Sequence, residues 1–167
     1  MALLPILQYP DPVLRQPCAP VGAVDDTIRQ LATDMLETMY AAPGRGLAAP
    51  QVGVLLRLFV MDCTWREGTP DPRICINPRI ADASPALAIN TESCLSIPGV
   101  PALVARPDWI LLHWTDLDGQ DQAEVLQGFD AIAAQHELDH LDGRLCIDHM
   151  DAQARAAAEP LLARFSA

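Results

Sequence analysis

The sequence predicts a single α+β domain in which antiparallel strands pack around a helix near the C-terminal end. Two observations carry this prediction. Apolar residues recur at helical spacing near both ends of the chain, and short aliphatic segments bounded by Gly and Pro lie between them. Helices outside a run of strands favour α+β over an alternating βαβ fold. The length of 167 residues suits one domain over residues 1–167, with a core that needs no disulfide support.

Composition narrows the classes of function. The net charge is −11 and all 11 basic residues are Arg, so neither nucleic acid nor a membrane surface is an expected partner. No apolar run approaches the roughly 20 residues of a membrane span, and the N-terminus does not resemble a signal peptide. The five cysteines are odd in number and scattered, which favours free thiols in a reducing compartment. We therefore expect a cytoplasmic protein.

The N-terminal part is expected to hold an arm, a helix and a loop. Prolines over residues 1–20 favour an ordered arm, in which Asp11 is placed to cap a short turn beginning at Pro12. One apolar face at three- and four-residue spacing predicts a helix from Asp25 to Ala42. The Gly- and Ala-rich segment 44–53 is expected to be a loop.

The middle of the chain is expected to be β-structure. The predicted strands are Leu55–Cys63, Ile74–Asn77 (closed by Pro78), Val100–Arg106, Trp109–Thr115 and Glu124–Gln127. Asp118-Gly119 is a hairpin signal between the last two strands. Segment 64–72 is expected to be a polar loop, and segment 90–98 an irregular segment.

Two helices are expected at the C-terminal end. The first runs from Gly128 to Leu141, where Asp142-Gly143 ends it. The second runs from Asp151 to Phe165, with Pro160 capping or kinking it.

The helix over residues 128–141 contains the pattern His-Glu-x-x-His, as His136, Glu137 and His140. Positions four apart lie on one face of a helix, so two imidazoles can hold a metal ion beside a carboxylate that accepts a proton from water. Such a pattern also arises by chance on surface helices. Here Ile132 and Ala133 extend the same face as an apolar stripe, which favours burial and hence a partner or a metal.

A catalytic metal site needs a third protein ligand. His149 lies nine residues after His140 beside Asp148, which is more typical of a surface histidine. Cys94 is the better candidate, because it lies in a polar segment and its thiolate would complete a Cys-His-His set. The other cysteines are interpreted as small buried apolar residues: Cys18, Cys63, Cys75 and Cys146.

Three ordered motifs resemble those of peptide deformylases. They are G-x-G-L-A-A-x-Q over residues 44–51, E-x-C-L-S over residues 92–96 and Q-H-E-x-D-H over residues 135–140. The resemblance covers about residues 5–150 and also includes the Pro10–Arg15 segment. It implies an α+β fold and removal of the N-formyl group from nascent polypeptides, which the enzyme would meet at the ribosome.

The resemblance also implies roles for individual residues. One divalent ion, expected to be Fe(2+) with Zn(2+) or another ion as alternatives, would be held by Cys94, His136 and His140. Glu137 would be the general base, and the Gln51 amide and Leu95 backbone N–H would donate to the oxyanion.

Further roles follow from the same resemblance. Gly46 would let the backbone approach the metal, and Ile132 and Ala133 would line a pocket for a methionine-like side chain, although core packing explains both equally well. Glu92 and Asp139 are expected beside the ligands. Arg106 is expected either to pair with Asp139 or Glu92 or to be a solvated strand-end charge.

Four positions depart from the family pattern. Arg45 and Asn90 stand where aliphatic residues are usual, Ser93 replaces a Gly before the Cys ligand, and Pro101 stands where many members have an Arg. Ser93 matters if that backbone needs a positive φ, and Arg45 at the pocket mouth would reject Met or select an acidic group.

The departures leave three hypotheses open. The first is a deformylase or a divergent paralogue of one. The second is an amidohydrolase acting on another small N-acyl amide, and the third is a non-catalytic metal-binding paralogue.

Overall fold

Five strands form the main sheet of the protein, and a computed structural model describes residues 2–166. Met1 and Ala167, the ends of the expected domain, lie outside the described residues. The strand order is β1-β2-β3-β6-β7 and every neighbouring pair is antiparallel. The strands are β1 (Gly46–Ala48), β2 (Leu58–Met61), β3 (Arg73–Ala83), β6 (Trp109–Thr115) and β7 (Asp121–Gln127).

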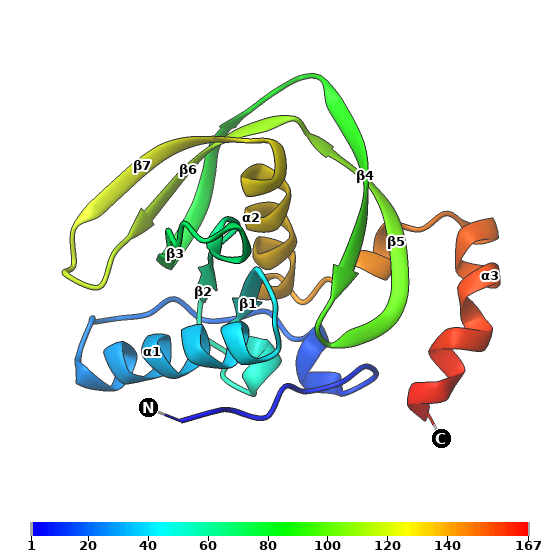
Figure 1. Ribbon diagram of the computed structural model, residues 1–167, viewed down its shortest axis with the longest axis horizontal. Helices are drawn as coiled ribbons and strands as arrows, with labels where there is room; N and C mark the ends of the chain where they lie inside the picture. The colour runs from blue at the N-terminus through cyan, green and yellow to red at the C-terminus, as the bar shows by residue number, and fades with distance from the viewer. Residues whose placement is uncertain (1, 167) are drawn as a thin grey trace.

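A second antiparallel sheet consists of β4 (Leu87–Cys94) and β5 (Ile97–Pro107), joined by the two-residue turn Leu95-Ser96. This hairpin arches beside α2 (Gly128–Leu141), which lies between it and the main sheet (Figure 1). Because it contacts both sheets, α2 is buried on most sides, and three of its nine buried residues are alanines. Small side chains there let strands approach the helix backbone closely.

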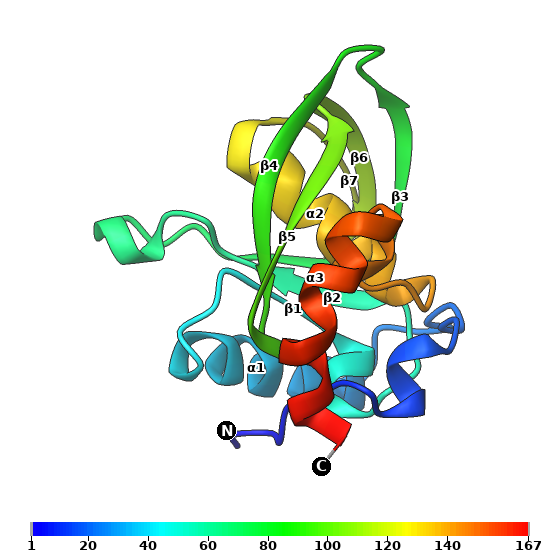
Figure 2. The same ribbon diagram turned by 90° about the vertical axis from the view of Figure 1, so that its right-hand side faces the viewer.

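Two further helices cover the outside of these layers. α1 (Asp26–Ala41) packs on β1 and β2, and α3 (Ala152–Leu162) packs on β5 (Figures 1 and 2). Five short 3-10 helices complete the described fold: η1 (Pro12–Arg15), η2 (Ala49–Val52), η3 (Trp65–Glu67), η4 (Cys146–His149) and η5 (Ala163–Ser166). No helix within residues 2–166 is both long enough and apolar enough to cross a membrane.

Local sequence signals explain the helix boundaries. The Asp25 side chain accepts a hydrogen bond from the Ile28 N–H and caps α1, and Asp151 caps α3 in the same way. At the end of α2, Gly143 has φ 75°, and a Cβ there would lie 2.5 Å from the Arg15 carbonyl oxygen. Only Gly satisfies both constraints, so α2 stops where the N-terminal arm crosses it.

The core has three parts, which correspond to the three helix–sheet contacts. One lies between α2 and the main sheet around Phe59 and Leu112, and another lies between α1 and β2 around Met35 and Leu58. The third joins β5 to α3 and includes Cys94. The metal-binding residues predicted from sequence therefore lie where two cores meet.

The α+β class, the antiparallel pairing and the central position of α2 are confirmed. The bounds of α2 and β6 match the prediction, and α1 differs by one residue at each end. Asp11 accepts from the Val13 N–H and caps η1, as expected. The predicted hairpin turn between β6 and β7 is confirmed, and Gly119 has φ 77° in it.

Several predicted strand bounds were wrong. β3 does not stop at Pro78. The register of its pairing with β6 shifts between Ile76 and Arg79, and Asn77 has φ 50°. Pro78 lies within this irregularity, where it interrupts no regular hydrogen-bond ladder. The segment expected to be irregular contains the end of β4 and the start of β5.

Other predicted bounds also differ from the structure. Part of the expected loop 44–53 forms β1 and η2, β2 is shorter than predicted, and β7 begins earlier. α3 contains Pro160 and ends at Leu162, where η5 follows. A three-residue edge strand such as β1 carries too little periodicity to be found from sequence.

Candidate metal centre

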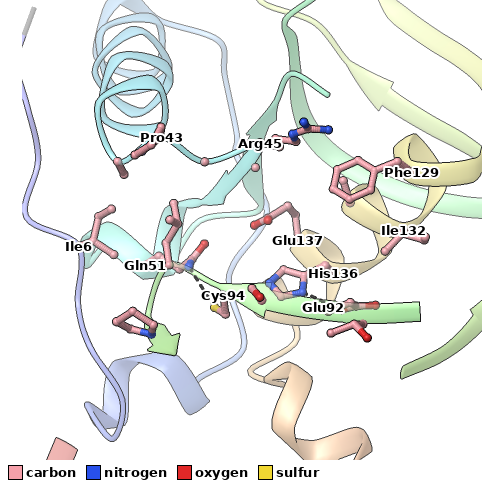
Figure 3. A pocket seen from close by; sticks show the side chains of 18 of the residues that line it. Ile6, Pro43, Arg45, Gln51, Glu92, Cys94, Phe129, Ile132, His136 and Glu137 are labelled. Carbon is pink, nitrogen blue, oxygen red and sulfur yellow. Dashed lines mark hydrogen bonds and ion pairs between the residues drawn. The ribbon is translucent and has the colours of Figure 1, made fainter. Parts of the chain in front are cut away.

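The helix α2 directs three chemically active side chains toward one point. His136 and His140 lie one turn apart with ring centroids 5.0 Å from each other, and Glu137 lies beside them. All three are buried, and Figure 3 shows His136 and Glu137 facing the same cavity. Burial of this face was predicted from its apolar continuation through residues 132 and 133.

Cys94 reaches the same point from the end of β4. Its Sγ lies 3.4 Å from Nε2 of His140, and one ligand atom from each of Cys94, His136 and His140 lies within 4.8 Å of the other two. The expectation that Cys94 lies in an irregular segment was wrong, because it ends a strand just before a tight turn. The hairpin therefore places the thiol rigidly against α2.

A buried ionic chain orients His136. Its Nδ1 lies 2.9 Å from Glu92, and Arg106 donates two hydrogen bonds to the same carboxylate over 2.6 and 2.9 Å. Arg106 also donates to Asp139 over 3.0 Å. From the sequence, Glu92 and Asp139 were alternative partners of Arg106. In the structure Arg106 binds both carboxylates. The solvated alternative was wrong, because Arg106 is only 5% exposed.

The electrostatics of this chain keep Glu92 ionised. Burial acts to raise the pKa of Glu92, but the hydrogen bonds from Arg106 and His136 outweigh it and lower the pKa to about 2. The resulting carboxylate holds the Nδ1 side of the His136 ring, which leaves Nε2 for a ligand.

His149 does not lie on the open surface as expected. Its Nε2 is 2.8 Å from Asp139, and its side chain is half-buried. It is not among the three residues whose ligand atoms converge. Asp139 therefore joins Arg106 and His149 behind the ligands, on the side of α2 away from the cavity.

Glu137 is the remaining charged group at the centre. Burial, the largest influence, raises its pKa to about 7. Its Oε2 is buried without a hydrogen-bond partner among the described residues. Gly46 of β1 lies so close that an added Cβ would be 2.5 Å from Oε1 of Glu137. The edge strand thus holds the carboxylate in place and leaves one oxygen free to accept a proton.

The residues at this centre fit a divalent metal ion. A thiolate and two imidazoles form a donor set that suits Zn(2+) and Fe(2+). The unpartnered Glu137 oxygen is consistent with the fit, because it is an acceptor that awaits a proton donor such as water. Three protein ligands would leave a position open for that water or for substrate.

Gln51 enters the centre from η2, with 1% of its surface exposed. Its Oε1 accepts from the Ala48 N–H over 2.9 Å, while Nε2 donates to the Ser96 hydroxyl over 3.1 Å and lies 3.6 Å from the Cys94 Sγ. The amide orientation is therefore set by partners at both ends. Ser96 was not singled out from sequence, although it belongs to the second motif.

A cavity of about 720 Å³ opens onto this centre. The four residues expected to contact substrate all line it: Arg45, Gly46, Ile132 and Ala133. Phe129 adds an aromatic wall that sequence reasoning missed, and Figure 3 shows Arg45 and Phe129 at the same rim. Ile6 and Gln8 of the N-terminal arm, also missed, line the cavity as well, and Figure 3 shows Ile6 across from Phe129. Their contact with the cavity is long-range, so local sequence carried no signal for it.

The residues that depart from the family pattern differ in whether they line the cavity. Ser93 and Asn90 line the cavity, whereas Pro101 is not among its lining residues. Ser93 does not have a positive φ, since Asn77 is the one non-glycine residue with a positive φ within residues 2–166. The Gly-to-Ser change is therefore accommodated without backbone strain.

The chain is similar in sequence to known proteins of one family. A family model described as polypeptide deformylase matches residues 3–156. A peptide deformylase of Maricaulis maris is 45% identical over 158 residues, which covers 95% of this chain and 91% of that protein. A peptide deformylase of Alkalilimnicola ehrlichii is 51% identical over 150 residues, which covers 90% of this chain and 83% of that protein.

Solved structures of peptide deformylases are similar to this chain in fold. The crystal structure of a peptide deformylase from Legionella pneumophila has a TM-score of 0.92 at 35% identity, covering 99% of this chain and 96% of that one. A peptide deformylase from Synechococcus elongatus, in complex with actinonin, has a TM-score of 0.89 at 40% identity, and the match covers 94% of this chain and 86% of that one. The similarity therefore extends over nearly the whole chain in both sequence and fold.

Proposed function

The chain belongs to the polypeptide deformylase family, so it removes the N-formyl group from nascent polypeptides, and we propose that Cys94, His136 and His140 hold the metal ion for this reaction. The observation that carries the proposal is the convergence of these three ligand atoms within 4.8 Å. When bound, a divalent ion would polarise the formyl carbonyl and lower the pKa of water.

The proposed reaction is hydrolysis of a formamide. Water adds to the formyl carbon, the C–N bond breaks, and formate and a free amine leave. Glu137 accepts the proton of the water and passes it to the nitrogen of the departing amine. Its unpartnered, buried Oε2 is suited to this transfer, because no internal hydrogen bond within the described residues competes for it.

The oxygen of the formyl group becomes negatively charged as water adds. We assign two donors to it, Nε2 of Gln51 and the backbone N–H of Leu95. Gln51 is buried with its amide orientation set by Ala48 and Ser96, and Leu95 follows Cys94 in the hairpin turn. Donors held in this way need no reorganisation when the charge develops.

The substrate side chain next to the formyl group would enter the cavity against Ile132, Ala133 and Phe129, which are apolar. A methionine side chain suits such a wall. Gly46 lies at the edge of this cavity and leaves room for the Glu137 carboxylate, because a Cβ at Gly46 would lie 2.5 Å from Oε1 of Glu137.

We further propose Fe(2+) as the physiological ion, and the cytoplasm, at the ribosome, as the place where the enzyme meets nascent chains. The five cysteines are all free, which suits a reducing compartment. Metal analysis of anaerobically purified protein, with activity measured for each reconstituted ion, tests the first point. Co-sedimentation with translating ribosomes tests the second.

The residue assignment is tested with Glu137→Ala. The variant should bind one metal ion per chain. It should release formate from formyl-Met peptides at least about a thousandfold more slowly, because the loss of a general base lowers a rate by roughly 10²- to 10⁴-fold. Near-normal turnover would show that another group accepts the proton. Loss of metal from the variant would place Glu137 among the ligands instead.

A further inference from the structure

The rim of the active-site cavity carries two arginines in a chain whose net charge is −11. Arg45 comes from the segment before β1, and Arg66 comes from η3. The two carboxylates that line the cavity, Glu92 and Glu137, are both buried. Glu92 is already bound by Arg106, so the rim differs in charge from the rest of the molecule.

Arg45 is committed to contacts within the protein. Its guanidinium donates to Glu67 over 2.8 Å and to the Cys63 carbonyl over 3.2 Å. It also lies over the Phe129 ring, 5.1 Å from the centroid. Arg45 therefore shapes the cavity wall, and its charge is compensated before substrate binds.

The loop that carries Arg66 is attached to the rim on both sides of that residue. Trp65 donates from its indole N–H to the Gly44 carbonyl over 2.9 Å, and its ring packs edge-on against Tyr40. Glu67, on the other side, holds Arg45. These contacts keep Arg66 at the opening of the cavity.

Arg66 itself has no carboxylate partner within 4.0 Å among residues 2–166. Its one described polar or aromatic contact is with the face of Trp65, at 5.6 Å. The side chain is exposed and lines the cavity. It is thus a cation that is available to a ligand at the place where a peptide enters.

The structure assigns to Arg66 the recognition of an acidic side chain in the residues that follow the formylated methionine. This inference rests on the proposed function, because it extends the same site toward the downstream part of the substrate. The apolar wall takes the first side chain, and Arg66 at the rim would attract a carboxylate on a following residue. Arg45 cannot serve in this way while Glu67 holds it.

The test compares matched peptides with amidated C-termini, so that each carries one carboxylate or none. Formyl-Met-Ala-Glu-Ala amide is compared with its Gln counterpart, and the Glu/Gln exchange is repeated at the second residue. At low salt we expect kcat/KM to be about two- to fivefold higher for the Glu peptide at one of these positions, the range for an exposed ion pair. The ratio should fall toward one as salt is added.

Variants separate Arg66 from general charge effects. Arg66→Ala should bring the Glu/Gln ratio to one, and Arg66→Lys should keep it above one. Arg164→Ala is the matched control, because Arg164 is exposed, lies in η5 and does not line the cavity; it should leave the ratio unchanged. A ratio of one in the unmodified enzyme, or a preference that survives Arg66→Ala, overturns the inference alone. Absence of formate release from every peptide would instead contradict the proposed function and this inference with it.

Discussion

The side-chain amide of Gln51 donates to the hydroxyl of Ser96 over 3.1 Å. Gln51 comes from η2 and Ser96 from the turn between β4 and β5, so this hydrogen bond joins the main-sheet side of the centre to the hairpin that carries Cys94. Both residues are at most 1% exposed. In such a dry environment the bond fixes which way the amide donors point.

Ser96→Ala should lower kcat about tenfold, because the Gln51 amide would lose one of its two positioning partners while the donor itself remains. KM for formyl-Met peptides should change much less. Steady-state formate release checks both parameters. Ser84→Ala is the matched control, since the Ser84 hydroxyl is also buried and hydrogen-bonded but lies in another turn; it should reduce stability and leave kcat unchanged. Equal losses in the two variants would contradict a positioning role for Ser96.

Gly46→Ala should reduce kcat by tenfold or more, since its Cβ would lie 2.5 Å from Oε1 of Glu137 and would displace that carboxylate. Metal content should be unchanged. Gly22→Ala is the control, because nothing lies within 4 Å of a Cβ at Gly22. If Gly46→Ala retains full turnover, then β1 does not hold Glu137 in its reactive position.

Arg106→Met should lower the free energy of unfolding by about 3–5 kcal/mol, because the Glu92 carboxylate would stay buried without its cation. Urea unfolding of the metal-loaded variant measures this. Arg144→Ala removes an exposed arginine 3.8 Å from Asp139 and should cost less than about 1 kcal/mol. Similar losses for the two variants would show that the buried chain behind His136 contributes no special stability.

Removal of metal should lower the melting temperature. An ion present at a thousandfold excess over its Kd stabilises the folded chain by about 4 kcal/mol, which corresponds to roughly 10 °C for a chain of this size. Calorimetry with and without chelator measures the shift. Cys94→Ala should abolish it, and Cys18→Ala should not, because Cys18 is a buried thiol outside the ligand cluster. An undiminished shift in Cys94→Ala would remove Cys94 from the ligand set.

Much of the fold could be predicted from local patterns. The apolar spacing and caps located α1 and α2 closely, because helix periodicity and capping are short-range properties of the chain. The strand bounds were less predictable. β3 passes through Pro78 because a change of register absorbs the proline there, and β1 is a strand because β2 lies beside it.

The site shows the same division. His136, Glu137 and His140 form one face through helix geometry alone, so the sequence by itself determined that two imidazoles and a carboxylate would lie together. The polar segment around Cys94 made it the candidate third ligand, and the resemblance then supplied Gln51. That Arg106 binds both Glu92 and Asp139 could not be decided from sequence, because the three residues come from β5, β4 and α2 and meet only after the hairpin packs against the helix.

The sequence by itself therefore determined the class of the fold, the face of α2 and the family to which the chemistry belongs. Only the tertiary structure decided which arginine at the rim of the cavity is paired within the protein. Arg45 and Arg66 are equivalent cations in the sequence, but Glu67 and Phe129 engage the first and leave the second exposed. Which arginine is compensated depends on distances between side chains from separate segments, and those distances are set by packing rather than by spacing along the chain.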